Sequence, residues 1–100
     1  MNLSIELTHE AKEDATLAVK WYDKQKEGLG DLFITYLNDT LENIKKYPAA
    51  YKKVHRLVRQ AALQKFPYVI LYKIDAQIIT VHCIFHTSQS PGKKIKRLKK

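Results

Sequence analysis

The chain has 100 residues, a formal net charge of +8 and a single cysteine, and 45% of its residues are hydrophobic. This length corresponds to one domain with a modest core, and no apolar run approaches the roughly 18 residues that a membrane span needs. One cysteine cannot form an internal disulfide, and the place of Cys83 in an apolar run predicts a core residue rather than a nucleophile. The N-terminal stretch lacks the basic and apolar regions of a signal peptide, so we expect a protein of the cytoplasm.

The charges are divided unevenly between the two halves of the chain. Residues 1–50 carry six Lys and nine Asp or Glu, a net charge of −3, whereas residues 51–100 carry nine Lys, three Arg and one Asp, a net charge of +11. Such a split predicts a polarised surface, one end of which attracts polyanions. Nucleic acid and an acidic protein segment are the partners that this distribution favours.

The first half of the chain predicts a strand followed by two helices. Apolar and polar residues alternate over residues 3–7, which is typical of a half-buried strand, and Thr8 is the predicted N-cap of a helix that Gly28 ends. The GLG link that follows is too short for anything but an antiparallel helical hairpin. Asp31 is the predicted N-cap of the second helix, whose wide apolar stripe ends before Pro48.

The second half of the chain predicts strands. Its residue pattern indicates one strand over residues 54–59 and another over residues 61–66, after which Pro67 breaks the ladder. The runs YVILYKI (68–74) and IITVHCIFH (78–86) flank a short turn and predict a β-hairpin. Both runs are nearly continuous in apolar residues, so we expect them at the centre of the sheet, covered on one face by the helices.

The order of these elements predicts an α+β fold, β-α-α-β-β-β, in which the helical hairpin packs on one face of an antiparallel sheet. The other face of the sheet, or one end of it, is expected to be open and basic. Residues 1–92 form the single predicted domain. Residues 93–100, KKIKRLKK, carry six positive charges and form a basic C-terminal tail, which is either a short amphipathic helix or a disordered segment.

Short motifs follow one another along residues 11 to 91. They are A-x(9)-W-Y at Ala11, Trp21 and Tyr22, G-L-G-x-x-F from Gly28 to Phe33, Pro48 and Tyr51, Arg59, F-P-Y from Phe66 to Tyr68, Tyr72, and I-F-H-T-S from Ile84 to Ser88 followed by Pro91. In order and spacing, this set resembles the plasmid-stabilisation branch of the RelE/ParE toxin superfamily. Within it, Trp21 and Tyr22 are expected to cover the helical hairpin and the sheet.

This resemblance implies the toxin component of a bacterial type II toxin–antitoxin system. Family members act on one of two targets: RelE-like proteins cleave mRNA in the ribosome, and ParE-like proteins inhibit DNA gyrase. The implied partner is an antitoxin whose acidic C-terminal segment wraps the toxin. No cofactor is expected, and the short apolar runs predict no membrane association. A third interpretation is an inactive or RNA-binding member of the family.

An RNA-cleaving site would need a base, an acid and cations around the reacting phosphate. His86, Arg59, Lys65 and Tyr68 are the candidate catalytic residues for that chemistry, and all four lie in the basic half of the chain. An alternative role for Arg59 is an ion pair with a carboxylate of the antitoxin. The chemistry needs no metal, and His82 and His86, about 13 Å apart along a strand, cannot hold one ion together.

The position after the H-T-S tripeptide departs from the family pattern. RelE-like ribonucleases resemble one another in having an arginine there, whereas this chain has Gln89. An amide can donate a hydrogen bond to phosphate but carries no charge. We therefore favour ParE-like gyrase inhibition, with Gln89, Lys93 and Lys94 as target-binding residues, and keep the RelE-like ribonuclease as the alternative.

Overall fold

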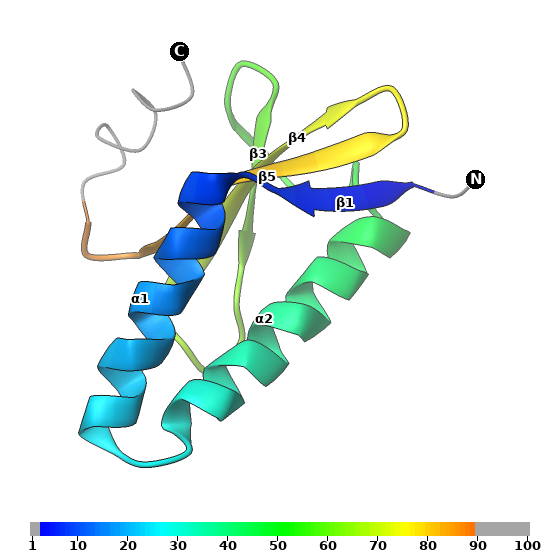
Figure 1. The fold of residues 1–100 in the computed structure, drawn as a ribbon. Coiled ribbons are helices and arrows are strands. Elements are labelled where there is room, and N and C mark those ends of the chain that lie inside the picture. The colour runs from blue at the N-terminus through cyan, green and yellow to red at the C-terminus, as the bar shows by residue number, and fades with distance from the viewer. Residues whose placement is uncertain (1–2, 90–100) are drawn as a thin grey trace.

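The computed structural model describes residues 3–89, which form five strands and two helices (Figure 1). In chain order the elements are β1 (Ser4–Leu7), α1 (His9–Gln25), α2 (Leu29–Lys46), β2 (Lys53–His55), β3 (Val58–Ala62), β4 (Tyr68–Asp75) and β5 (Ile78–His86). The predicted α+β class, with one strand before a helical hairpin, is therefore confirmed. The predicted tail, residues 93–100, lies outside the described residues.

The strands form one sheet in the order β1-β5-β4-β3-β2. Each of β2, β3 and β4 pairs with its successor in antiparallel fashion, as expected, but β1 lies parallel to β5, from Ser4 opposite Ile78 to Leu7 opposite Val81. The sheet is thus mixed rather than purely antiparallel. The parallel pair is possible because the helical hairpin and three strands separate β1 from β5 in the chain.

The two helices cover one face of the sheet. They run antiparallel and are joined by the short link at the lower end of Figure 1. Phe33, Leu37 and Ile44 of α2 are at most 3% exposed and belong to one core together with buried side chains of α1, β4 and β5, which are Ala11, Ala18, Ile70, Tyr72, Ile79, Val81 and Ile84. This core carries most of the hydrophobic stabilisation of the domain.

The other face of the sheet carries a second apolar cluster. Because successive residues of a strand point to opposite faces, Val69 and Leu71 of β4 lie opposite the face that Ile70 and Tyr72 present to the helices. The cluster consists of Val58, Val69, Leu71, Cys83 and Phe85, all buried. The expected core position of Cys83 is confirmed, and the expectation of an open, basic face does not hold at the centre of the sheet.

The start of α1 agrees with the sequence, whereas the start of α2 does not. Thr8 caps α1, and its Oγ1 accepts the Ala11 N–H at 3.1 Å. The predicted N-cap of α2, Asp31, is wrong, because α2 begins at Leu29 and its N-cap is Gly28, with φ of 87°. A side chain of α1 supplies the missing acceptor, since the carboxylate of Asp23 accepts the Gly30 N–H at 2.8 Å.

The segment predicted as one strand over residues 54–59 is a tight β-hairpin. His55 pairs with Val58, so that Arg56 and Leu57 form the turn, and Arg56 has a left-handed φ of 51°. This turn lacks the glycine, asparagine or proline that marks most hairpins, so its residue pattern resembles that of one continuous strand. The strand predicted over residues 61–66 is likewise shifted to β3, and the hairpin of β4 and β5 is confirmed.

Candidate functional site

Tyr68 and His86 meet where the two central strands end. The register of β4 and β5 places them opposite each other, and their rings pack edge to face with centroids 5.3 Å apart. Tyr68 also contacts the rings of Tyr22 and Phe33, at 6.1 and 5.0 Å, so His86 borders an aromatic cluster between the sheet and the helices. Tyr22 is therefore part of the core region, as predicted.

The environment of Tyr68 suits a hydrogen-bond donor better than a base. Burial raises the pKa of Tyr68 above its usual 10.0, and the neighbouring Tyr22 and Asp14 raise it further. The phenol consequently keeps its proton at neutral pH. In this position Tyr68 can donate a hydrogen bond to an anion but cannot accept a proton from a nucleophile.

The loop after β5 closes on itself through His86 and Gln89. The His86 N–H donates to Oε1 of Gln89 at 3.0 Å, the Ser88 N–H donates to Nδ1 of His86 at 3.0 Å, and the Gln89 N–H donates to the His86 carbonyl at 2.9 Å. Nδ1 of His86 is thus an acceptor, which places the proton of the neutral imidazole on Nε2. The amide oxygen of Gln89 is used within the loop.

Arg59 holds a different part of the molecule. Its guanidinium donates to the backbone carbonyls of Ala49 at 3.2 Å and Tyr51 at 2.6 Å, in the segment that links α2 to β2. The opposite residue on β4 is Tyr72, whose hydroxyl donates to the Pro48 carbonyl at 2.6 Å. Arg59 and Tyr72 together anchor this segment to the sheet.

The four predicted catalytic residues do not gather at one point. Tyr68 and His86 are in contact, and Lys65 lies in the short loop before Tyr68, exposed and with φ of 70°. Arg59 lies opposite Tyr72, four residues from Tyr68 along β4 or about 13 Å at the rise of a strand. Of the three predicted target-binding residues, Gln89 closes the loop, whereas the two lysines, Lys93 and Lys94, lie outside the described residues.

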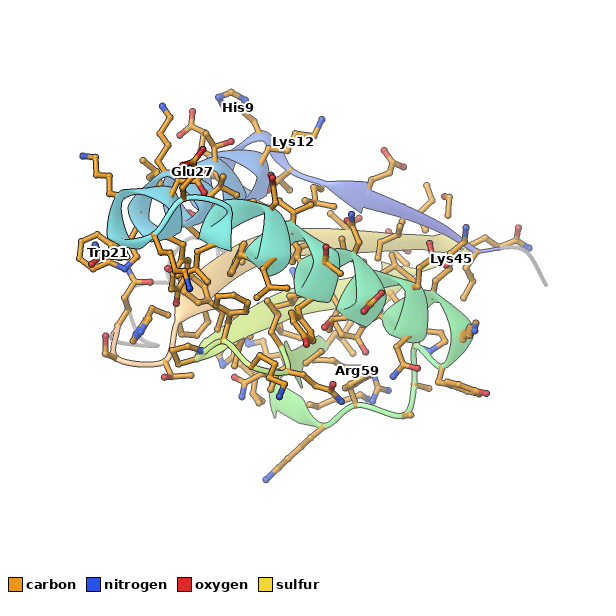
Figure 2. All side chains as sticks on the ribbon, turned by 90° about the horizontal axis from the view of Figure 1, so that it is seen from below. His9, Lys12, Trp21, Glu27, Lys45 and Arg59 are labelled. Carbon is orange, nitrogen blue, oxygen red and sulfur yellow. The ribbon has the colours of Figure 1, made fainter. Side chains whose placement is uncertain are left out.

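An exposed apolar pair on α1 was not among the features predicted from the sequence. Trp21 is 57% exposed and Leu17 is 65% exposed, so the expectation that Trp21 covers the sheet is wrong (Figure 2). Together with Lys20, Asp23 and Lys24 they line an open hollow of about 490 Å³. The signal was available, because Leu17 and Trp21 are four residues apart on the helix and lie off the stripe of small residues that faces the core.

Residues 3–89 contain neither a metal-binding cluster nor a membrane-spanning helix. Across that range no group of three or more His, Cys, Asp or Glu side chains is arranged to hold a metal ion. Neither helix in the same range is long and apolar enough to cross a membrane.

Residues 5–91 match the family described as ParE toxin of type II toxin-antitoxin system, parDE. The chain belongs to the ParE toxin family. The resemblance drawn from the motifs is confirmed, and the protein is the toxin component of a type II toxin–antitoxin system. The match covers almost all of the chain that the structure describes.

The fold of this ParE-family chain is shared with a solved structure titled "Chromosomal ParDE TA system from P. aeruginosa". The TM-score is 0.76 at 13% sequence identity, and the alignment covers 85% of this chain and 96% of that chain. At this identity the likeness concerns the fold alone. A search of curated proteins gave no significant match.

Proposed function

We propose that this ParE toxin inhibits DNA gyrase and does not cleave mRNA. The observation that carries this proposal is the use of Gln89 to close the loop after β5, where its amide oxygen accepts the His86 N–H. RelE-like ribonucleases resemble one another in having an arginine at this position. In this chain the same position holds an uncharged side chain whose hydrogen bond stays within its own loop. Such a loop supplies shape and hydrogen bonds to a protein target, but no fixed cation to a reacting phosphate.

The arrangement of the other candidate residues supports the same proposal. Cleavage of RNA needs a base, an acid and cations within hydrogen-bond reach of one phosphate. The guanidinium of Arg59 donates its hydrogen bonds to the carbonyls of Ala49 and Tyr51, and burial raises the pKa of Tyr68. His86 accepts a hydrogen bond at Nδ1 from Ser88. Arg59 thus holds the α2–β2 segment, about 13 Å along the sheet from the contact between Tyr68 and His86.

The test compares the two targets directly. The chain is induced in growing cells, transcript ends on translating ribosomes are mapped, and the purified protein is added to a gyrase supercoiling assay. We expect intact transcripts and reduced supercoiling. Transcript cleavage on translating ribosomes with normal supercoiling would overturn the proposal, and normal growth with folded protein would favour an inactive family member.

The contact between Tyr68 and His86 keeps the ribonuclease as the second candidate function. Two groups able to exchange protons or hydrogen bonds lie side by side at the end of the sheet, with Lys65 in the adjacent loop. If transcripts are cleaved, His86→Ala should abolish the cleavage. Unchanged cleavage by that variant would remove His86 from the active site.

We also propose that the cognate antitoxin docks its acidic segment on α1, over Leu17 and Trp21, in the cytoplasm. Large apolar side chains with this exposure, bordered by Lys20 and Lys24, fit an acidic amphipathic partner.

Trp21→Ala should weaken antitoxin binding at least about tenfold in calorimetry, because tryptophan is a common hot-spot residue. The matched control is Tyr47→Ala at the end of α2, since Tyr47 is 60% exposed. A larger loss from Tyr47→Ala than from Trp21→Ala would move the antitoxin to another surface.

A further inference from the structure

The hairpin of β2 and β3 presents basic and aliphatic side chains at one corner of the molecule. Its turn lies at the upper end of Figure 1, at the same end of the sheet as the turn between β4 and β5. Leu57 at the tip is 65% exposed and Val54 is 41% exposed, and Lys53 and Arg56 are exposed beside them. Exposed apolar and exposed basic side chains therefore lie side by side at this corner, which offers both kinds of contact to a partner.

The backbone of this hairpin is held in a conformation that its residues do not favour. Arg56 adopts φ of 51°, a region that glycine and asparagine occupy with less strain. A shift in register between Lys53 and His55 adds an irregularity to β2 directly before the turn. Strained backbone and strand irregularities of this kind are concentrated at functional sites, where they orient particular side chains. Here they orient Arg56 and Leu57.

The charge around the hairpin has one sign. From Tyr51 to Ile74 the chain has six Lys and Arg residues and no Asp or Glu. Arg59 is engaged with backbone carbonyls, whereas Lys52, Lys53 and Arg56 form no side-chain hydrogen bond or ion pair with any part of the chain that the structure describes. By contrast, the lysines of α1 lie among acidic residues of the same helix, including Glu13 and Asp23. The hairpin is therefore the described surface best suited to a polyanion.

We infer that the β2–β3 hairpin is a contact element for duplex DNA. Lys52, Lys53 and Arg56 bind backbone phosphates, and Leu57 enters the groove between them. Only the tip of the hairpin has to approach the minor groove, where an inserted aliphatic side chain can press between base steps. This activity is distinct from the proposed binding of gyrase and of the antitoxin, and it is measured in the absence of both.

The test measures DNA binding by the full chain as a function of salt. Binding to a labelled duplex of about 20 base pairs is followed by fluorescence anisotropy between about 50 and 200 mM salt. The double variant Lys53→Ala, Arg56→Ala removes two phosphate contacts, so the slope of log K against log salt should become shallower by about 2. Leu57→Ser removes no charge, so it should weaken binding about fivefold at every salt concentration and leave that slope unchanged.

Two further variants separate the hairpin from general charge and from misfolding. Lys20→Ala, Lys24→Ala makes the same charge change on α1 and should leave the slope unchanged. Arg56→Gly removes one charge while suiting the left-handed backbone, so it should reduce the slope by about 1 in a protein that folds at least as well. An equal decrease of the salt slope in the α1 and hairpin double variants would overturn the inference. So would an unchanged DNA affinity of Leu57→Ser. Unchanged DNA binding with weakened binding to gyrase would assign the hairpin to a protein contact instead.

Discussion

The carboxylate of Asp14 on α1 accepts the Ile84 N–H of β5 at 3.1 Å, and this bond joins residues 70 apart in the chain. β1 pairs with β5 only as far as Val81, so within residues 3–89 the following part of β5 has no neighbouring strand on that side. A helix side chain takes the place of the missing strand. The same carboxylate contributes to the raised pKa of Tyr68, which places it beside the end of the sheet where Tyr68 and His86 meet.

Removing this carboxylate should destabilise the fold. Asp14→Ala leaves the Ile84 N–H without its acceptor, at an expected cost of about 1–2 kcal/mol in the free energy of unfolding. Asp14→Asn keeps an oxygen in the same position and should cost less. Urea unfolding followed by far-ultraviolet circular dichroism measures both values. Equal losses in the two variants would show that charge, and not the hydrogen bond to Ile84, is what matters at this position.

The buried hydroxyl of Tyr72 should make stability depend on alkaline pH. Burial raises the pKa of Tyr72 to about 12 from an ordinary value of 10.0, with Arg59 acting in the opposite direction. The folded state therefore retains this proton after the unfolded state has begun to lose it. The corresponding stabilisation is complete below pH 10 and disappears as the pH rises through about 12.

Tyr72→Phe tests this dependence. The variant loses the hydrogen bond to the Pro48 carbonyl, so it should be less stable by about 1 kcal/mol at neutral pH. Its free energy of unfolding should also fall less steeply above pH 10, because one titrating group with a raised pKa is gone. Tyr22 and Tyr68 remain, and their raised pKa values leave part of the slope in place. A variant that retained the full alkaline slope would contradict the assignment to Tyr72.

Gly30 and Asp23 should be energetically coupled. A Cβ atom on residue 30 would lie 2.7 Å from both carboxylate oxygens of Asp23, so Gly30→Ala forces that side chain to turn away and lose its hydrogen bond to the Gly30 N–H. The loss of about 1 kcal/mol offsets the gain that alanine normally brings to a helix. We expect Gly30→Ala to be nearly neutral alone and stabilising by about 0.5–1 kcal/mol in an Asp23→Ala background.

Gly28 provides the matched control for this cycle. Its φ of 87° disfavours any side chain, although a Cβ atom there would meet no atom within 4 Å. Gly28→Ala should therefore cost about 1 kcal/mol whether or not Asp23 is present. Chemical denaturation of the single and double variants gives both coupling energies, and a coupling of Asp23 to Gly28 as large as that to Gly30 would refute the clash.

Local patterns in the sequence predicted the elements whose cause is local. The alternation of residues 3–7, the Thr8 cap and the hairpin of β4 and β5 depend on neighbours in the chain, and all three are confirmed. The N-cap of α2 was misplaced because its acceptor, Asp23, comes from the preceding helix. The turn at Arg56 could not be predicted, because none of the residue types there favours a left-handed φ.

In the candidate site, too, features with local causes were predicted and features that depend on distant segments were not. Tyr68 and His86 were predicted to face a common target, and the strand register does bring their rings into contact. The separate role of Arg59 depends on carbonyls of the α2–β2 segment, whose position relative to β3 no single-sequence pattern conveys. Gln89 was recognised as a departure from the family, but its bond to His86 became visible only in three dimensions.

Substitutions of Gln89 distinguish loop closure from phosphate binding. If Gln89 acts by accepting the His86 N–H, Gln89→Glu keeps an acceptor and should retain toxicity, whereas Gln89→Arg has none and should lose part of it. If Gln89 instead binds phosphate, the order reverses, because arginine adds a cation and glutamate repels the anion. Growth inhibition after induction ranks the variants. Hydrogen exchange of the His86 amide should be fast in Gln89→Arg and slow in Gln89→Glu, and toxicity that follows the phosphate order would remove the main support for a target other than RNA.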